Sequence, residues 1–311
     1  MGGIATREAY GKTLVELGRE NPKIVVLDAD LSKSTKTSDF AKAFPERFFN
    51  IGIAEQNLMG VAAGLAEVGK IPFASTFAVF AAGRAFEIIR NSICYPKLNV
   101  KIAATHAGLT VGEDGASHQA VEDLALMRAL PNMQVFVPAD AAQTRAIVKK
   151  AVEIEGPVYI RLGRSGVPEV FTEDCQFTPG RGTVLKEGSD VTIVALGIMT
   201  AKALEAARLL EAEGIAARVL DMASLKPVDR ELLVESAKLT GAVVTAEEHS
   251  VIGGLGSTVA EVLSEEYPVP VIKVGVNDVF GESGTPQELL AKYGLTSEAI
   301  VSAAKKAISL K

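Results

Sequence analysis

Tryptophan is absent from this sequence of 311 residues, and cysteine and histidine are scarce, with two and three copies. Cys94 and Cys175 are too few for a disulfide framework. His106, His118 and His249 leave little material for a zinc site, so we expect no metal centre built by this chain alone. The start also lacks a basic segment followed by an apolar stretch, as a secretory signal would have. These scarcities together favour a reducing, cytoplasmic setting.

Long hydrophobic runs and clusters of positive charge are missing too. The longest uncharged run, 71–83, falls short of the ~20 residues that span a bilayer. A net charge of −6 without basic clusters argues against nucleic-acid binding. Hydrophobic residues at 48% and charged residues at 23% exclude global disorder. We therefore expect a folded protein that binds neither membrane nor nucleic acid.

Strand and helix patterns alternate along the chain, which indicates parallel sheets covered on both faces. The first predicted helix begins at Thr6, which we expect to act as its N-cap, and a further helix is predicted near 81–93. Between 165 and 189 the periodicity fails and glycine and proline recur, which predicts a linker. The predicted strands are 24–27, 72–76, 100–105, 134–137 and 158–162 before the linker, and 191–196, 217–220, 242–246 and 269–274 after it. The sequence therefore predicts an α/β fold of two doubly wound domains, 1–166 and 190–311, joined by a linker at 167–189.

Two segments place reactive side chains just after predicted strands. Glu55 lies in the first turn of a helix, where its carboxylate suits either the helix dipole or a ligand at the carboxyl edge of the sheet. His106 and His118 enclose a glycine-rich loop that also carries Asp114. Loops of this length are usually functional or mobile, although hydrogen-bonded loop histidines are the alternative.

Other candidates have a structural interpretation beside the functional one. Phe77 and Phe80 fit a core strand that leads into a helix as well as an aromatic platform for a ligand. Arg161 and Arg164, at the end of a strand, are either solvated or placed to capture a phosphate or carboxylate. The Gly-Gly-Leu-Gly sequence at 253–256 does not meet the dinucleotide fingerprint, and no Walker A motif is present. We interpret 253–256 as a tight turn before a helix.

These segments occur in the order found in the second half of transketolase, which the chain resembles over essentially its whole length. The resemblance rests on five stretches: Gly-Ile-Ala-Glu-Gln at 52–56, Thr-Phe-Ala-Val-Phe at 76–80, Thr-His at 105–106 with Val-Gly-Glu-Asp-Gly-Ala-Ser-His-Gln at 111–119, Leu-Pro-Asn at 130–132, and Val-Pro-Ala-Asp at 137–140. It implies a pyrimidine-binding domain of thiamine diphosphate enzymes, followed by the smaller transketolase C-terminal domain, which mainly packs and dimerises.

The resemblance also implies roles for individual residues. Glu55 would hydrogen-bond the aminopyrimidine of thiamine diphosphate and favour its reactive tautomer. The other residues expected at the cofactor are Phe77 and Phe80, which would stack on the pyrimidine, and Asp30. The residues expected at the substrate phosphate are Arg7, Ser34, His106 and Arg164. Asp114 would bind a sugar hydroxyl, and His118 would carry a proton near the ketose carbonyl. The implied catalytic residues are Glu55, His106 and His118.

The chain departs from the family pattern in two ways. Many transketolases have Gly-Ile-Arg-Glu-His where this chain has Gly-Ile-Ala-Glu-Gln, and a further aromatic where it has Gly83; both changes resemble deoxyxylulose-phosphate synthase. The chain also lacks the Gly-Asp-Gly motif with which the family holds metal and diphosphate. The resemblance therefore implies a separate N-terminal subunit that supplies this domain and most of the ligands to a Mg or Ca ion.

We thus expect the C-terminal subunit of a two-chain transketolase. It would transfer a two-carbon ketol unit between sugar phosphates, only when joined to the N-terminal subunit in an α2β2 assembly. Four alternatives remain: a deoxyxylulose-phosphate synthase-like enzyme, a transketolase acting on an unusual sugar phosphate, the β subunit of an oxo-acid dehydrogenase, and a catalytically idle scaffold. The histidine loop with Asp114 favours a polyhydroxylated sugar as substrate.

Overall fold

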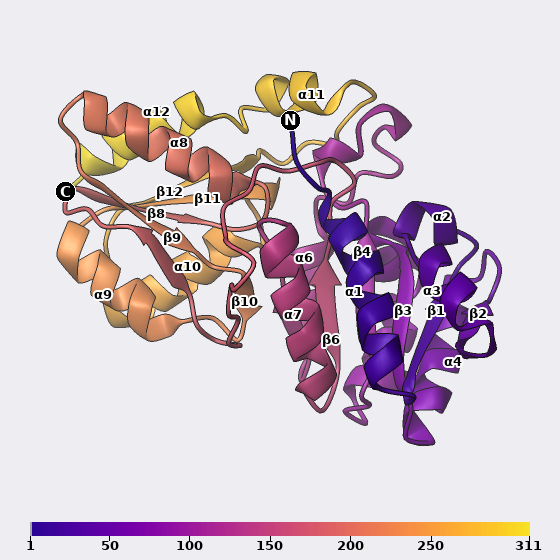
Figure 1. Ribbon diagram of the computed structural model, residues 1–311. Coiled ribbons are helices and arrows are strands. Elements are labelled where there is room, and N and C mark those ends of the chain that lie inside the picture. The colour runs from indigo at the N-terminus through magenta and orange to yellow at the C-terminus, as the bar shows by residue number, and fades with distance from the viewer. Residues whose placement is uncertain (1) are drawn as a thin grey trace.

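The computed structural model describes residues 2–311 as two α/β units that lie side by side, each built on its own sheet (Figure 1). The first sheet has seven strands in the order β10-β5-β6-β4-β3-β1-β2, and the second has five in the order β12-β11-β8-β9-β7. Parallel pairing dominates both sheets, and their central strands β1, β3, β4, β6, β8 and β9 are buried along their whole length. The predicted α/β fold with two doubly wound units is confirmed.

The first unit contains six strands of the first sheet: β1 (Ile24–Asp28), β2 (Phe48–Asn50), β3 (Ile71–Phe77), β4 (Lys101–Thr105), β5 (Gln134–Phe136) and β6 (Val158–Arg161). Its helices are α1 (Thr6–Glu20), α2 (Ser32–Thr35), α3 (Ser38–Ala43), η1 (Pro45–Arg47), α4 (Glu55–Glu67), η2 (Phe80–Arg84), α5 (Phe86–Ile88), η3 (Ile89–Cys94), η4 (Leu109–Asp114), α6 (Asp123–Ala129) and α7 (Ala141–Glu153). Because β1, β3, β4 and β6 are parallel, the loops at their carboxyl ends meet at one edge of the sheet.

The second unit contains β7 (Thr183–Lys186), β8 (Val191–Ala195), β9 (Ala217–Asp221), β11 (Val243–Ser250) and β12 (Val271–Val276). Its helices are α8 (Met199–Ala212), α9 (Arg230–Thr240), α10 (Leu255–Glu266), α11 (Pro286–Lys292) and α12 (Ser297–Ile308). One short strand, β10 (Ser224–Lys226), leaves this unit and pairs antiparallel with β5. The first sheet is therefore completed by the second half of the chain.

Several local features differ from the sequence-based expectation, and the short strands β2 and β10 were not predicted. Thr6 is the first helical residue rather than the N-cap, because its hydroxyl accepts a hydrogen bond from the Gly163 amide at 2.8 Å. The stretch expected to be a linker contains strand β7, which pairs with β9 at the edge of the second sheet. The helix expected at 81–93 is broken into the π-helical turns η2 and η3 around the short α5.

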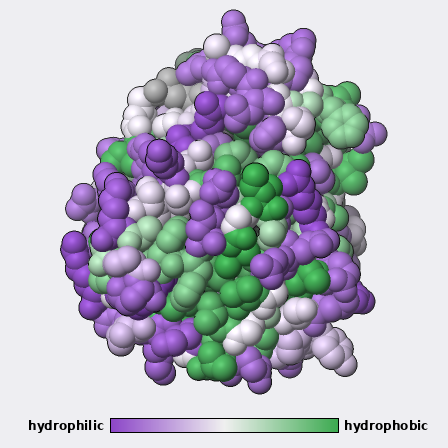
Figure 2. Space-filling model, turned by 90° about the vertical axis from the view of Figure 1, so that its right-hand side faces the viewer, coloured by the Kyte–Doolittle hydropathy of each residue, from purple (hydrophilic) through white to green (hydrophobic). Residues whose placement is uncertain are grey.

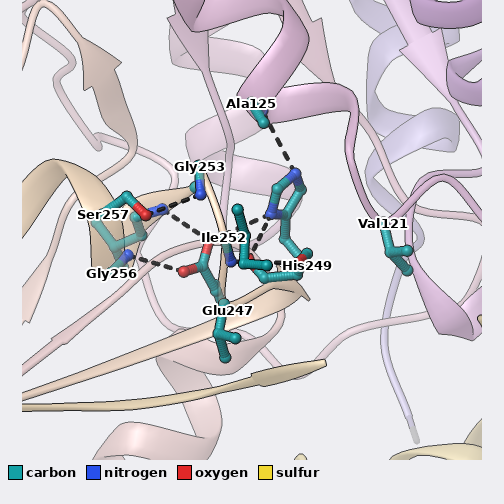
Figure 3. Close-up of polar contacts among 12 residues, drawn as sticks. Val121, Ala125, Glu247, His249, Ile252, Gly253, Gly256 and Ser257 are labelled. Carbon is teal, nitrogen blue, oxygen red and sulfur yellow. Dashed lines mark hydrogen bonds and ion pairs between the residues drawn. The ribbon is translucent and has the colours of Figure 1, made fainter. Parts of the chain in front are cut away.

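The glycine-rich turn at 253–256 is a tight turn before helix α10, as predicted. Its helix N-terminus already holds a carboxylate of the chain, because Glu247 accepts hydrogen bonds from the amides of Leu255 at 2.7 Å and Gly256 at 2.8 Å (Figure 3). A Cβ at Gly254 would lie 2.0 Å from Glu247 Oε2, so only glycine fits there. The turn thus binds an internal anion.

Candidate active site

Four of the predicted phosphate ligands meet at the carboxyl edge of the first sheet. Arg7 Nη1 donates to the Ser34 carbonyl at 2.8 Å, and Arg7 Nε donates to the Arg164 carbonyl at 3.2 Å. Arg7 Nη1 also lies 3.5 Å from His106 Nε2. Residues from α1, α2 and the loops after β4 and β6 therefore converge on one guanidinium, although they are far apart in the sequence.

His106 is an uncharged member of this cluster. Burial, helped by the positive charges of Arg7 and Arg164, lowers the pKa of His106 from its usual 6.5 to about 3. Its Nδ1 lies 2.9 Å from Thr105 Oγ1, and its Nε2 faces a donor, Arg7. We assign the proton to Nδ1, since a guanidinium has no acceptor to offer Nε2. Positive charge for a phosphate therefore comes from the arginines.

Acid should destabilise the free chain through His106. The unfolded chain binds a proton at this side chain below pH 6.5 and the folded chain does so only near pH 3, so stability falls as the pH falls between these values. From pH 7 to pH 5 this effect is about 2 kcal/mol. Urea titrations at pH 7 and pH 5 measure this loss of stability. The loss should be about 2 kcal/mol smaller in His106→Asn than in the parent. Asparagine suits the backbone φ of 57° at this position. An equal pH dependence in both proteins would contradict the neutral assignment.

Arg164 faces the loop that separates the two histidines. Its Nη1 donates to the Val111 carbonyl and to Glu113 Oε2 at 3.1 Å, and lies 3.8 Å from Asp114 Oδ2. The Arg164 side chain is about one-third exposed. The predicted sugar ligand Asp114 is thereby placed beside the predicted phosphate ligand Arg164. Ligand phosphate would compete with Glu113 for this guanidinium.

An aromatic cluster continues the site beyond His106. The ring of Phe77 stacks on His106 with centroids 3.8 Å apart, and lies parallel to Phe80 at 5.8 Å. His118 packs edge-on against both phenylalanines, at 6.2 Å from Phe77 and 5.5 Å from Phe80. Phe77 is buried and Phe80 is half-buried, so of the two rings Phe80 is the more accessible.

Glu55 lies at the other end of this cluster, in the first turn of α4. Its carboxylate is only 5% exposed, yet it borders an open pocket of about 500 Å³ that is lined by 53–57 and Arg84. Arg84 Nη1 donates to Glu55 Oε1 at 3.2 Å, and the Arg84 guanidinium lies 4.2 Å from the centre of the Phe80 ring. The guanidinium thus makes both contacts expected of an aminopyrimidine, a bond to Glu55 and a stack on Phe80.

Asp30 lies apart from this pair, at the end of β1. It adopts a φ of 64° and accepts a hydrogen bond from Asn50 Nδ2 at 2.9 Å. Asn50 Oδ1 in turn accepts from the Gly52 amide at 3.0 Å, at the start of the segment that leads to Glu55. Asp30 therefore reaches Glu55 only through the intervening backbone.

Contacts run without a break from one end of the site to the other. They pass from Glu55 through Arg84, Phe80, Phe77 and His106 to Arg7. Sequence reasoning missed Arg84; its signal was the spacing of one turn from Phe80. Arg161, considered as a second phosphate ligand, instead lies buried against Asp123 at 3.0 Å.

Two kinds of feature are absent from residues 2–311. No helix in this range is long and apolar enough to cross a membrane. The same range holds no group of three His, Cys, Asp or Glu side chains arranged to bind a metal ion.

Comparison with known proteins gives a consistent result. Residues 2–169 match the family model of the transketolase pyrimidine binding domain, and residues 180–300 match that of the transketolase C-terminal domain. A putative transketolase C-terminal section from Methanocaldococcus jannaschii is 53% identical over 94% of this chain and 93% of its own length. A 6-deoxy-6-sulfo-D-fructose transketolase subunit from a Clostridium species is 46% identical over 96% of this chain and 92% of its own.

Solved structures agree. A split gene transketolase, described as an inactive β4 tetramer, is 87% identical and superposes with a TM-score of 0.94, covering 99% of this chain and 100% of that one. The transketolase of Pichia stipitis in complex with sedoheptulose-7-phosphate is 25% identical with a TM-score of 0.83, and the match spans 99% of this chain but 46% of that one.

The fold and the matched domains define a protein of the transketolase class that carries the pyrimidine-binding and C-terminal domains. The chain belongs to the transketolase family. Within the family it corresponds to the C-terminal section, as the sequence predicts.

Proposed function

We propose that this chain, together with an N-terminal subunit, transfers a two-carbon ketol unit from a ketose phosphate to an aldose phosphate with thiamine diphosphate as cofactor. The observation that carries the proposal is the unbroken set of contacts from Glu55 to Arg7. A buried carboxylate suited to a cofactor stands at one end, and a guanidinium suited to a phosphate stands at the other.

The residues of this chain fit one part of the cofactor. Glu55, a buried carboxylate at an open pocket, would hold or share a proton with the pyrimidine ring, and Phe80 would pack on the ring face. Thiamine diphosphate, when bound, supplies the carbanion chemistry. Residues 2–311 hold no group of three His, Cys, Asp or Glu side chains arranged to bind the metal, and the sequence lacks the family's Gly-Asp-Gly motif, so we assign the metal and the diphosphate to the partner chain.

The proposed roles of the substrate-binding residues are consistent with where their side chains lie. Arg7 and Arg164 would hold the substrate phosphate, with Ser34 and neutral His106 beside them. Asp114 would bind a sugar hydroxyl. His118 would move a proton near the ketose carbonyl, a role supported by its edge-on packing against Phe77 and Phe80.

The partner is expected to cover helix α4. Hydrophobic residues gather on the side of the molecule where α4 lies (Figures 1 and 2). Ile53 and Val68, at the two ends of α4, are 77% and 72% exposed. Between them, Gly60 and Gly64 are exposed and have open space where a Cβ would be, which allows close approach of another backbone. Since Glu55 begins this helix, a chain that holds the cofactor has to lie here.

The chain alone should not transfer ketol groups, whereas a mixture with its N-terminal subunit, thiamine diphosphate and magnesium should. The similar protein described as an inactive β4 tetramer supports this expectation. A coupled assay with a pentose phosphate pair measures both conditions. Ketol transfer by the purified chain alone would contradict the proposal. Decarboxylation of pyruvate by the mixture, without cleavage of the ketose, would favour the oxo-acid dehydrogenase alternative.

A further inference from the structure

The loop that carries the predicted substrate residues is held from the second unit of the molecule. Glu248, near the end of β11, accepts a hydrogen bond at its Oε1 from the Thr110 amide at 2.6 Å. Thr110 lies in η4, between His106 and Asp114 in the chain. Glu248 is 4% exposed, and 138 residues separate it from Thr110 in the sequence. A buried carboxylate of one unit therefore fixes the backbone of a substrate loop in the other.

Gly108 also packs closely against the carboxylate of Glu248. Gly108 has a φ of +82°, and a Cβ added to it would lie 2.4 Å from Glu248 Cδ. Glycine is thus required at 108 both for its backbone conformation and for the approach of Glu248. The carboxylate lies against the loop backbone at both Gly108 and Thr110.

A buried arginine completes this contact. Arg161 Nη2 donates to the Glu248 carbonyl at 2.9 Å and to the Ala120 carbonyl at 3.1 Å, and its Nε donates to Asp123. The Gly108 amide also donates to the Ala120 carbonyl, at 2.9 Å. Arg161 therefore joins the far end of the loop to β11. Burial raises the pKa of Glu248, and the nearby Arg161 charge opposes that rise.

The same strand end makes further contacts with the first unit. The Ser250 amide donates to the Val121 carbonyl at 2.7 Å, and the Ala125 amide donates to His249 Nε2 at 3.4 Å (Figure 3). After β12, the Glu282 carbonyl accepts from Gln119 Nε2 at 2.9 Å. The segment from Gly108 to Ala125 is thus supported along its length by the second unit.

We propose that Glu248 is a positioning residue for the sugar-phosphate site: through Thr110 it sets the position of the loop that presents His106, Asp114 and His118. This inference rests on the proposed function, because it assigns the loop to substrate binding. A role in general stability would lower the free energy of unfolding and leave substrate affinity unchanged. A positioning role changes the affinity for the sugar phosphate more than it changes the turnover of bound substrate.

The neighbouring Glu247 provides a matched control. It is equally buried, at 1% exposed, but its carboxylate points to the amides of Leu255 and Gly256 at the start of α10 within its own unit (Figure 3). Removing either carboxylate leaves buried backbone amides without their acceptor, at a comparable cost to stability. Only Glu248 contacts η4.

The variants Glu248→Ala, Glu248→Gln and Glu247→Ala should separate the two roles in the reconstituted pair. We expect Glu248→Ala to raise the KM for the sugar phosphate about tenfold with a smaller fall in kcat. Glu248→Gln keeps an acceptor for Thr110 and should restore KM to within about threefold. Glu247→Ala should lower the melting temperature and leave KM unchanged. Glu248→Asp, which withdraws the carboxylate by one methylene, replaces Glu248→Ala if that variant does not fold.

Amide hydrogen exchange of the free chain tests the same contact without any activity. Exchange over 107–112 should accelerate in Glu248→Ala and stay at the parental rate in Glu247→Ala. Parental exchange in both variants, or an equal rise in KM for both, would overturn the positioning role. A parent pair that shows no ketol transfer would defeat the proposed function, while the exchange result would still decide whether Glu248 holds the loop.

Discussion

Glu55→Gln should lower ketol transfer by the reconstituted pair about 10²–10⁴-fold, the range typical for loss of a proton-transfer group. Glutamine preserves the shape of the side chain and one acceptor, but it cannot hold or share a proton. The carboxylate is 5% exposed and faces the pocket, so water would substitute poorly for it. Single-turnover measurements at saturating thiamine diphosphate would isolate the chemical step from cofactor binding.

The result needs a control for loss of a negative charge in the first turn of a helix. Glu298 lies in the first turn of α12 and is exposed, so Glu298→Gln removes the same charge away from α4 and should keep parental turnover. The circular dichroism of both variants should match that of the parent. Parental turnover in Glu55→Gln would exclude its predicted role and would favour the idle-scaffold alternative.

Arg84 occupies the place beside Glu55 that a bound pyrimidine would take. In the free chain its guanidinium both bonds Glu55 and stacks on Phe80, so a bound pyrimidine has to displace it. Arg84→Met should therefore lower the dissociation constant of thiamine diphosphate in the reconstituted pair, measured by fluorescence titration. Weaker binding in this variant would show instead that Arg84 supports the cofactor.

The sequence predicted most of the strands that carry the site. Parallel strands end at one edge of a sheet, so residues that follow β1, β4 and β6 meet there whatever their separation along the chain. Arg7, in α1, follows none of these strands, and only the family resemblance grouped it with His106; their side chains lie 3.5 Å apart. The buried apolar runs gave nine of the twelve strands in the described residues to within a few residues, and the short strands β2, β7 and β10 were not predicted.

What the sequence did not predict depends on contacts between distant segments. Arg84 reaches Glu55 from a π-helical turn, whereas the apolar pattern had suggested an ordinary helix. Arg161 looked available for phosphate, but Asp123 neutralises it in the core. The uncharged state of His106 follows from burial beside Arg7, and neither the depth of burial nor the direction of the arginine can be read from spacing.

Gly64→Glu should prevent assembly with the N-terminal subunit and so abolish activity, while leaving the free chain as stable as before or more so. Gly64 is exposed on α4, with no atom near the place of a Cβ, so a side chain fits the free chain. Glutamate also favours a helix over glycine by roughly 0.5–1 kcal/mol. In the complex, the same side chain would bring a bulky charge into a close backbone contact that excludes water.

Thermal unfolding of the free chain measures the effect of Gly64→Glu on stability. Light scattering of the mixture measures its effect on assembly. Ser302→Glu is the matched control, because it adds the same charge at an exposed position of α12, away from α4 (Figure 1). That variant should assemble and turn over like the parent. If Gly64→Glu assembled normally, the partner would have to lie on another face, and Glu55 would then be too far from the cofactor to act as proposed. Loss of assembly without loss of stability would instead identify α4 as the surface through which the two chains complete one active site.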